Sequence, residues 1–173
     1  MGNPARAAAY RVGQVLRGFR TTIPGDDAAD VQALLTGAEL ALFLRMHARD
    51  RVHAICVMRR LEHEGAASRD LLAAGLLHDI AKGNPRLWER SFFAIVESLS
   101  PRALDRIAAR DGMRWRRAMW ALLHHPAVGA ALLSEAGSTG RVVELVAHHT
   151  ERTGPRARSD SELASLITAD GAC

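Results

Sequence analysis

The segment AAGLLHDIAKG, residues 73–83, runs apolar residues directly into a histidine and an aspartate. Leu72, Leu76 and Asp79 are spaced i, i+4, i+7 and therefore share one face of a helix, while the equally apolar neighbouring face carries His78. We predict that both polar side chains point into the core. An ionised carboxylate in a protein interior is costly unless a cation compensates it, so Asp79 requires a positively charged partner.

Other segments also carry a histidine or an aspartate on an apolar helix face, which predicts that its side chain points into the core. The last helix carries Leu163, Leu166 and Ile167 on one face, and Asp170 ends that stripe. His53 lies within the mostly apolar stretch DRVHAICVM, in a helix that we expect to run to about residue 64. The remaining inward candidates are His125, His148 and His149.

For any one of these histidines, a core residue with a satisfied hydrogen bond is the more common explanation. The occurrence of several inward-facing histidines and aspartates in one chain favours a different explanation. Two buried carboxylates and several histidines, with no buried lysine or arginine evident for each, are best reconciled by metal ions that supply the missing positive charge. Imidazole and carboxylate ligands without thiolate indicate a divalent ion such as Fe, Mn, Ni, Co, Zn or Mg, and an open coordination position would make it catalytic.

The ordered phrases DRVHAICV, LLHDIAK, HHPAVGAALL, VAHHTER and LITAD resemble the HD-domain superfamily of metal-dependent phosphohydrolases. The resemblance implies an all-α helical bundle with a metal site shared across the superfamily. The ligands that it implies for this shared site are His53, His78, Asp79 and Asp170. In members with two metals the aspartate that matches Asp79 bridges, and the second ion would be held by His125, His148 and His149.

The resemblance also implies that Lys82 faces substrate phosphate, and we expect Arg152 to help orient the substrate. His124 and His125 compete for one ligand role, and His125 is favoured because it immediately precedes the proline. The motifs are closest to the bacterial enzymes that hydrolyse diadenosine tetraphosphate and to the cyclic-dinucleotide phosphodiesterases with a GYP signature. This chain reads TERTGPRARSD in place of that signature, which argues against a cyclic dinucleotide.

These observations predict a metal-dependent phosphohydrolase that acts on a nucleotide or related small phosphate ester or anhydride. Asp79 and Lys82 are the expected catalytic residues, and two divalent ions are the expected cofactors. The alternative is a catalytically inactive HD module that binds a nucleotide or a protein partner and uses its metal structurally. Nucleic-acid binding through RDGMRWRRAMW, residues 110–120, is disfavoured because Trp and Met at helical spacing are usually core.

Composition predicts one all-α unit, because 173 residues with 48% hydrophobic content suffice for a single core and the apolar residues recur at helical spacing. We divide the chain into an N-terminal helical extension, residues 1–35, which packs on the core, and the HD domain, residues 36–173. The net charge of +4 suits an anionic small molecule but decides little. The oligomeric state stays open.

Cys56 and Cys173 lie far apart in the sequence, so we expect neither a disulfide nor a thiolate metal site, and we predict a cytoplasmic protein. No stretch offers the roughly 20 apolar residues of a membrane span, so no membrane partner is expected.

Turn and capping residues predict several helix boundaries. Ser68 caps a helix that ends before Gly83, and Pro126 occupies the first position of another. Ser159 and Glu162 form a capping box for the last helix, which a charged loop over residues 151–159 precedes.

Overall fold

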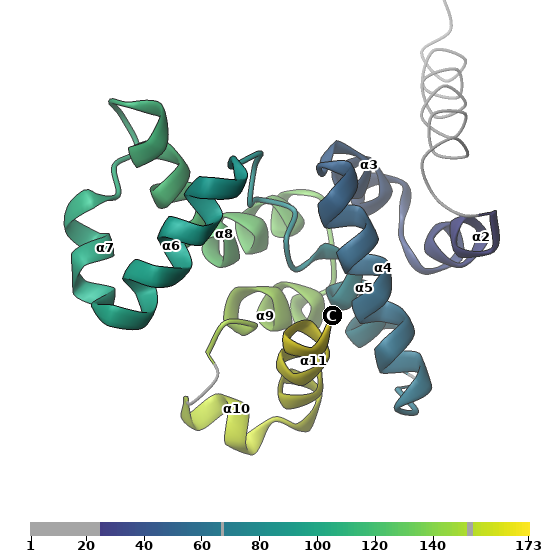
Figure 1. Cartoon of the computed structure of the whole chain (residues 1–173). Coiled ribbons are helices and arrows are strands. Elements are labelled where there is room, and N and C mark those ends of the chain that lie inside the picture. The colour runs from purple at the N-terminus through teal and green to yellow at the C-terminus, as the bar shows by residue number, and fades with distance from the viewer. Residues whose placement is uncertain (1–24, 67, 152–153) are drawn as a thin grey trace, which may run out of the picture.

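The computed structural model describes residues 25–66, 68–151 and 154–173, and within these ranges the chain forms ten helices and no strand (Figure 1). The predicted all-α class is confirmed. The first 24 residues of the predicted N-terminal extension, residues 1–35, lie outside the described residues. The helices are α2 (Gly25–Leu34), α3 (Gly37–Arg45), α4 (Ala48–His63), α5 (Arg69–Leu77), α6 (Leu87–Leu99), α7 (Pro101–Ile107), α8 (Arg114–Glu135), α9 (Gly140–His148), α10 (Pro155–Ser159) and α11 (Ser161–Ala172).

Helix α5 lies at the centre of the larger core, where it packs against α2, α3, α4, α9 and α11. All seven residues from Leu71 to Leu77 are buried. A helix that is apolar on every side must be covered on every side, which explains the continuous apolar run in the sequence. The neighbours contribute fully buried side chains such as Phe43, Met58, Leu145 and Leu166. The C-terminal end of this central helix delivers His78 and Asp79 to the interior.

A smaller apolar cluster joins α6, α7 and the first half of α8. It is built on Leu104, Met119 and Leu122, and α6 and α7 lie together on the side of the molecule away from α2 (Figure 1). Helix α8 continues beyond this cluster and adds Leu133 to the larger core. The long α8 therefore connects the two clusters, and its middle carries His125.

Two predicted helix starts are wrong. No helix begins at Pro126, because α8 runs through this residue from Arg114 to Glu135. The last helix is capped by Asp160, whose carboxylate accepts a hydrogen bond from the Leu163 amide at 3.1 Å. Ser159 instead ends the short helix α10, so part of the predicted loop at residues 151–159 is helical.

The predictions for α4 and α5 are partly confirmed. Helix α4 ends at His63, and Ser68 caps α5 by accepting from the Leu71 amide at 3.3 Å. Helix α5 ends at Leu77, however, and a turn precedes Gly83, whose φ of +70° favours glycine.

The expectation of unpaired cysteines is wrong, because Cys56 and Cys173 form a disulfide. Their separation of 117 residues in sequence is bridged by the packing of α11 against α4. The cytoplasmic location rested partly on unpaired cysteines and stays a prediction. No helix in the described part of the chain has the length and apolarity that a membrane span requires.

Helix α2 contributes Ala28 and Val31 to the larger core. The proposed boundary at residue 35 stays a prediction, since residues 1–24 lie outside the described ranges.

Candidate metal centre

Six of the seven predicted metal ligands converge where α4, α5, α8, α9 and α11 meet. His53 comes from α4, His78 and Asp79 from the end of α5, His125 from α8, His149 from the end of α9, and Asp170 from α11. Four of these residues are buried, namely His78, Asp79, His125 and His149. His53 and Asp170 are partly exposed, with 26% and 21% of their side-chain surfaces accessible.

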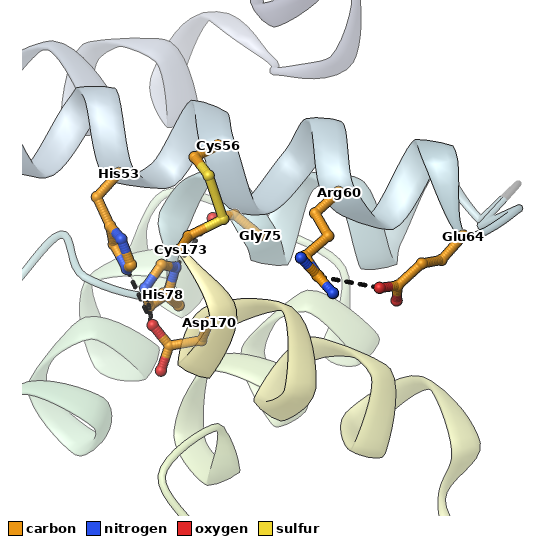
Figure 2. The surroundings of a disulfide bond; sticks show 8 residues. All are labelled: His53, Cys56, Arg60, Glu64, Gly75, His78, Asp170 and Cys173. Atoms are coloured by element: carbon orange, nitrogen blue, oxygen red, sulfur yellow. Dashed lines mark hydrogen bonds and ion pairs between the residues drawn. A yellow bond between two sulfur atoms is a disulfide. The ribbon is translucent and has the colours of Figure 1, made fainter.

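The first ligand group contains His53, His78 and Asp79, which offer ligand atoms that all lie within 4.8 Å of one another. Asp170 adjoins this group. Its Oδ1 atom lies 2.9 Å from His53 Nε2 and 3.4 Å from His78 Nε2 (Figure 2). The four residues that the resemblance predicts for the shared metal site are therefore neighbours.

The second ligand group contains Asp79, His125 and His149, again with ligand atoms within 4.8 Å of one another. The Nε2 atoms of the two histidines face each other at 3.1 Å. Asp79 belongs to both groups and presents a different oxygen to each. Its Oδ2 atom lies 3.4 Å from His78 Nε2, whereas its Oδ1 atom lies 3.4 Å from His125 Nε2 and 3.9 Å from His149 Nε2.

Helix ends orient two of the histidine rings. The Nδ1 atom of His78 lies 2.9 Å from the Gly75 carbonyl oxygen, and that of His149 lies 2.7 Å from the Val146 carbonyl oxygen. Both carbonyls belong to the last turn of their helix, where carbonyls have no intrahelical donor. Because a carbonyl oxygen only accepts, Nδ1 carries the hydrogen and Nε2 points to the centre, the arrangement typical of metal-binding histidine.

Pro126 provides the corresponding carbonyl for His125. A proline inside a helix has no N–H to donate to the carbonyl four residues earlier, which here belongs to Leu122. His125 Nδ1 donates to this same Leu122 oxygen at 2.7 Å. Pro126, which suggested a helix start in the sequence, thus has another role. It leaves the Leu122 carbonyl oxygen free to accept the hydrogen bond that fixes the His125 ring.

Without a metal ion, positive charge near the carboxylates is supplied by protonated His78 and by Lys82, and a bound ion would replace the proton on His78 Nε2. Burial opposes charge on His78, but Asp79 and Asp170 outweigh it and raise the pKa of His78 to about 10. Burial likewise opposes ionisation of Asp79, yet His78, His125 and Lys82 hold its pKa well below the ordinary value. Lys82 Nζ donates to Asp79 Oδ2 at 2.6 Å. The partly exposed Lys82 therefore compensates Asp79, although no buried lysine was evident for it in the sequence.

His149 differs from His78 in its charge. Burial, together with the neighbouring His78 and His125, lowers the pKa of His149 to about 3. The His149 imidazole is thus neutral at physiological pH, the form in which histidine binds metal.

Two buried atoms at the junction of the groups lack a hydrogen-bond partner among the described residues, namely His78 Nε2 and Asp79 Oδ1. Buried polar atoms without partners are rare in proteins and require an explanation. An imidazole nitrogen and a carboxylate oxygen are both ligands of divalent transition ions. The residues present therefore fit the divalent ion that the sequence predicts.

The remaining predicted residues lie apart from this junction. His148 Nδ1 lies 2.5 Å from Glu151 Oε1, and the Arg156 guanidinium contacts the same ring, so His148 belongs to neither ligand group. His124 packs against the ring of Trp120, with ring centroids 4.8 Å apart. Arg152 lies outside the described residues.

A cavity of about 970 Å³ adjoins the candidate centre. Its wall includes His125, His149, Asp170, Lys82, Arg90, Phe93, Leu122, Leu123, Glu97 and Glu151. Arg90 had no signal in the sequence, because its place in the wall depends on how α6 packs against α7 and α8. In this structure Arg90 also contacts the buried Asp50 at 3.0 Å.

The arginines of residues 110–120 have partners within the chain. Arg114 contacts the buried Glu89 at 2.7 Å, and Arg116 and Arg117 donate to backbone carbonyls at 2.8 and 2.9 Å. Met119 is fully buried. Each of these three arginines therefore has a structural role within the fold.

The all-helical bundle gathers histidines and aspartates from five helices in and beside two groups that could hold metal ions. The HD domain family model matches residues 39–169, and this chain belongs to the HD-domain family. The predicted family is confirmed, but the match does not distinguish its branches, so neither branch named above is supported. No curated protein and no solved structure gives a significant match.

Proposed function

We propose that this protein is a metal-dependent phosphohydrolase that acts on a nucleotide or related small phosphate ester or anhydride. The observation that carries the proposal is the position of Asp79, which offers one oxygen to each of two ligand groups and leaves Oδ1 without a hydrogen bond among the described residues. A carboxylate with this arrangement suits a bridging ligand of a two-ion site. Membership of the HD family supports the same reading.

His53, His78, Asp79 and Asp170 would hold one ion, and Asp79, His125 and His149 would hold the other. Bound divalent ions supply an acidified water at neutral pH and neutralise phosphoryl oxygens during in-line attack. His148, also predicted as a ligand, would have to leave Glu151 and Arg156 to join the second group.

Lys82 is suited to hold substrate phosphate. Its ammonium group has three donors, of which one is directed to Asp79, and the side chain lines the cavity. Lys82 can therefore contact a phosphoryl oxygen while it keeps its hydrogen bond to Asp79. Arg152 is proposed as a further substrate contact, because it follows the cavity residue Glu151 in the sequence.

The shape of the cavity supports an organic phosphate as substrate. Phe93, Leu122 and Leu123 give it an apolar wall, whereas Lys82 and the metal-ligand candidates give it a polar one. Its volume of about 970 Å³ is typical of sites for ligands much larger than inorganic phosphate. A nucleoside group against the apolar wall would leave its phosphate directed at Asp79 and Lys82.

The test is a phosphate-release screen. Protein stripped with a chelator is supplied separately with Mn²⁺, Fe²⁺, Co²⁺, Ni²⁺ or Mg²⁺ and incubated with nucleotides and other phosphate compounds. We expect metal-dependent release that Lys82→Met reduces and Asp79→Asn abolishes. Asp105, an exposed residue of helix α7, offers a matched control in Asp105→Asn, which should retain full activity. Metal bound without turnover of any compound would instead favour the non-catalytic module.

A further inference from the structure

The Cys56–Cys173 disulfide lies beside one half of the candidate metal centre (Figure 2). Cys56 follows His53 by three residues on α4, and Cys173 follows Asp170 by three residues at the end of α11. Residues three apart in a helix lie on the same side, one turn from each other. The covalent link and the 2.9 Å contact between His53 and Asp170 therefore join the same two helices at adjacent turns.

Asp170 lies in the last turn of α11. The opposite end of α11 is held by Arg141, which contacts Asp160 at 2.6 Å and Glu162 at 2.8 Å. The carbonyl groups in the last turn of a helix receive no N–H from within the helix, so this turn tends to fray. The disulfide fixes the turn that would otherwise fray and that carries a predicted metal ligand.

We propose that the Cys56–Cys173 disulfide is a redox-sensitive clamp that positions Asp170 against His53, so that its reduction weakens metal binding at the first ligand group. This inference rests on the metal centre of the proposed function. Cys56 and Cys173 are both exposed, so an external thiol can reach them.

The chemistry of opening is thiol–disulfide exchange with a dithiol reductant. One thiolate of the dithiol attacks a sulfur of the bridge, the Sγ–Sγ bond breaks, and the other cysteine leaves as a thiolate that takes up a proton. The second thiolate of the dithiol then resolves the mixed disulfide and releases the remaining cysteine thiol. Two electrons pass from the dithiol to the protein, and the dithiol becomes a disulfide. A disulfide oxidant closes the clamp by the reverse steps.

The experiment compares Mn²⁺ binding to the oxidised full-length chain with binding to the same chain reduced by dithiothreitol and freed of the reagent under argon. Mn²⁺ is the probe because it prefers oxygen and nitrogen ligands, so the released thiols do not create a new site for it. We expect reduction to weaken binding by about 10- to 100-fold, the range for lost support of a metal ligand. Amide hydrogen exchange over residues 166–173 should become faster in the reduced protein, with or without metal.

Cys173→Ser should bind Mn²⁺ like the reduced parent and should not respond to dithiothreitol. Arg60→Ala is the matched control, because Arg60 lies on α4 beyond Cys56 and pairs with the exposed Glu64 (Figure 2). This variant should keep the full redox response. Equal Mn²⁺ affinity in the oxidised and reduced parent would overturn the clamp while leaving the metal centre intact. Absence of Mn²⁺ binding in both forms would overturn the metal centre and the clamp together.

Discussion

His125 Nε2 lies 3.4 Å from Asp79 Oδ1, an oxygen that makes no hydrogen bond within the described residues. The His125 ring is fixed from its other side by the Leu122 carbonyl, so the two atoms face each other in a set geometry. Asp79 Oδ2, by contrast, accepts from Lys82. The two oxygens of one carboxylate thus have different surroundings, and several predictions depend on that difference.

Asp79→Asn should remove metal from both ligand groups, because the amide cannot bridge two cations as a carboxylate can. We expect metal content after desalting to fall to near zero, with activity lost as well. Elemental analysis beside the parent and Asp105→Asn measures this. Retention of the full metal content in Asp79→Asn would rule out the bridging role.

His148 and His149 form a matched pair for testing the second group. His149→Ala should lower metal stoichiometry, because its Nε2 faces the junction, whereas His148→Ala should keep the stoichiometry of the parent, because His148 contacts Glu151. Turnover at neutral pH should fall much more than substrate affinity in His149→Ala, since the metal matters most for charge that develops in the transition state. Loss of metal from His148→Ala but not from His149→Ala would assign the ligand role to His148.

Pro126→Ala should raise stability and lower metal affinity at the same time. A proline inside a helix costs up to about 3 kcal/mol, so its removal should raise the melting temperature. The new Ala N–H would engage the Leu122 carbonyl and release the His125 ring. We expect metal affinity of the second group to fall by about 10-fold or more, as for other lost supports of a ligand.

The control is Ser134→Ala, an exposed substitution on the same helix that should stabilise α8 without changing metal affinity. Unchanged metal binding in Pro126→Ala would show that the proline does not position His125.

Asp160→Asn should destabilise the protein in a pH-dependent way. Arg141 lowers the pKa of Asp160 to about 2, so this carboxylate contributes its full stabilisation above its ordinary pKa of 3.8 and loses it as the pH falls through about 2. Linkage puts the contribution at roughly 1 to 2 kcal/mol at neutral pH. Urea unfolding of the parent and variant should therefore differ at pH 7 and converge near pH 2.

Asn keeps the ability to cap α11, so the difference in unfolding free energy between parent and variant reports the loss of the carboxylate charge. Glu144→Gln is the control, because Glu144 contacts Arg141 from an exposed position. A difference between parent and Asp160→Asn that stays constant with pH would contradict the assignment.

Helical spacing predicted the inward direction of several metal-ligand candidates. Leu163, Leu166 and Asp170 share a face of α11, as their spacing requires. Asp79 also points inward, but it follows the end of α5 at Leu77, so its direction is set by the turn and not by helical spacing within α5. The fold class followed from the same periodicity. Family membership then supplied the grouping of these residues, which spacing cannot give.

The features missed by sequence reasoning depend on contacts between distant segments or on competing local signals. The disulfide requires α11 to pack on α4, and nothing local to Cys56 or Cys173 reports this packing. Pro126 carries the signal of a helix start, but the packing of α8 across both apolar clusters carries the helix through it. Ser159 and Asp160 are both good caps, and Arg141 on α9 favours Asp160.

The most direct measurement is an anomalous difference map from a crystal of the protein soaked in Mn²⁺. The account predicts two peaks, one in contact with His53, His78, Asp79 and Asp170 and the other in contact with Asp79, His125 and His149, with ligand distances near 2.0 to 2.3 Å. A map without a peak at Asp79, or with Mn²⁺ bound only elsewhere, would contradict the central claim that these buried side chains form a metal centre.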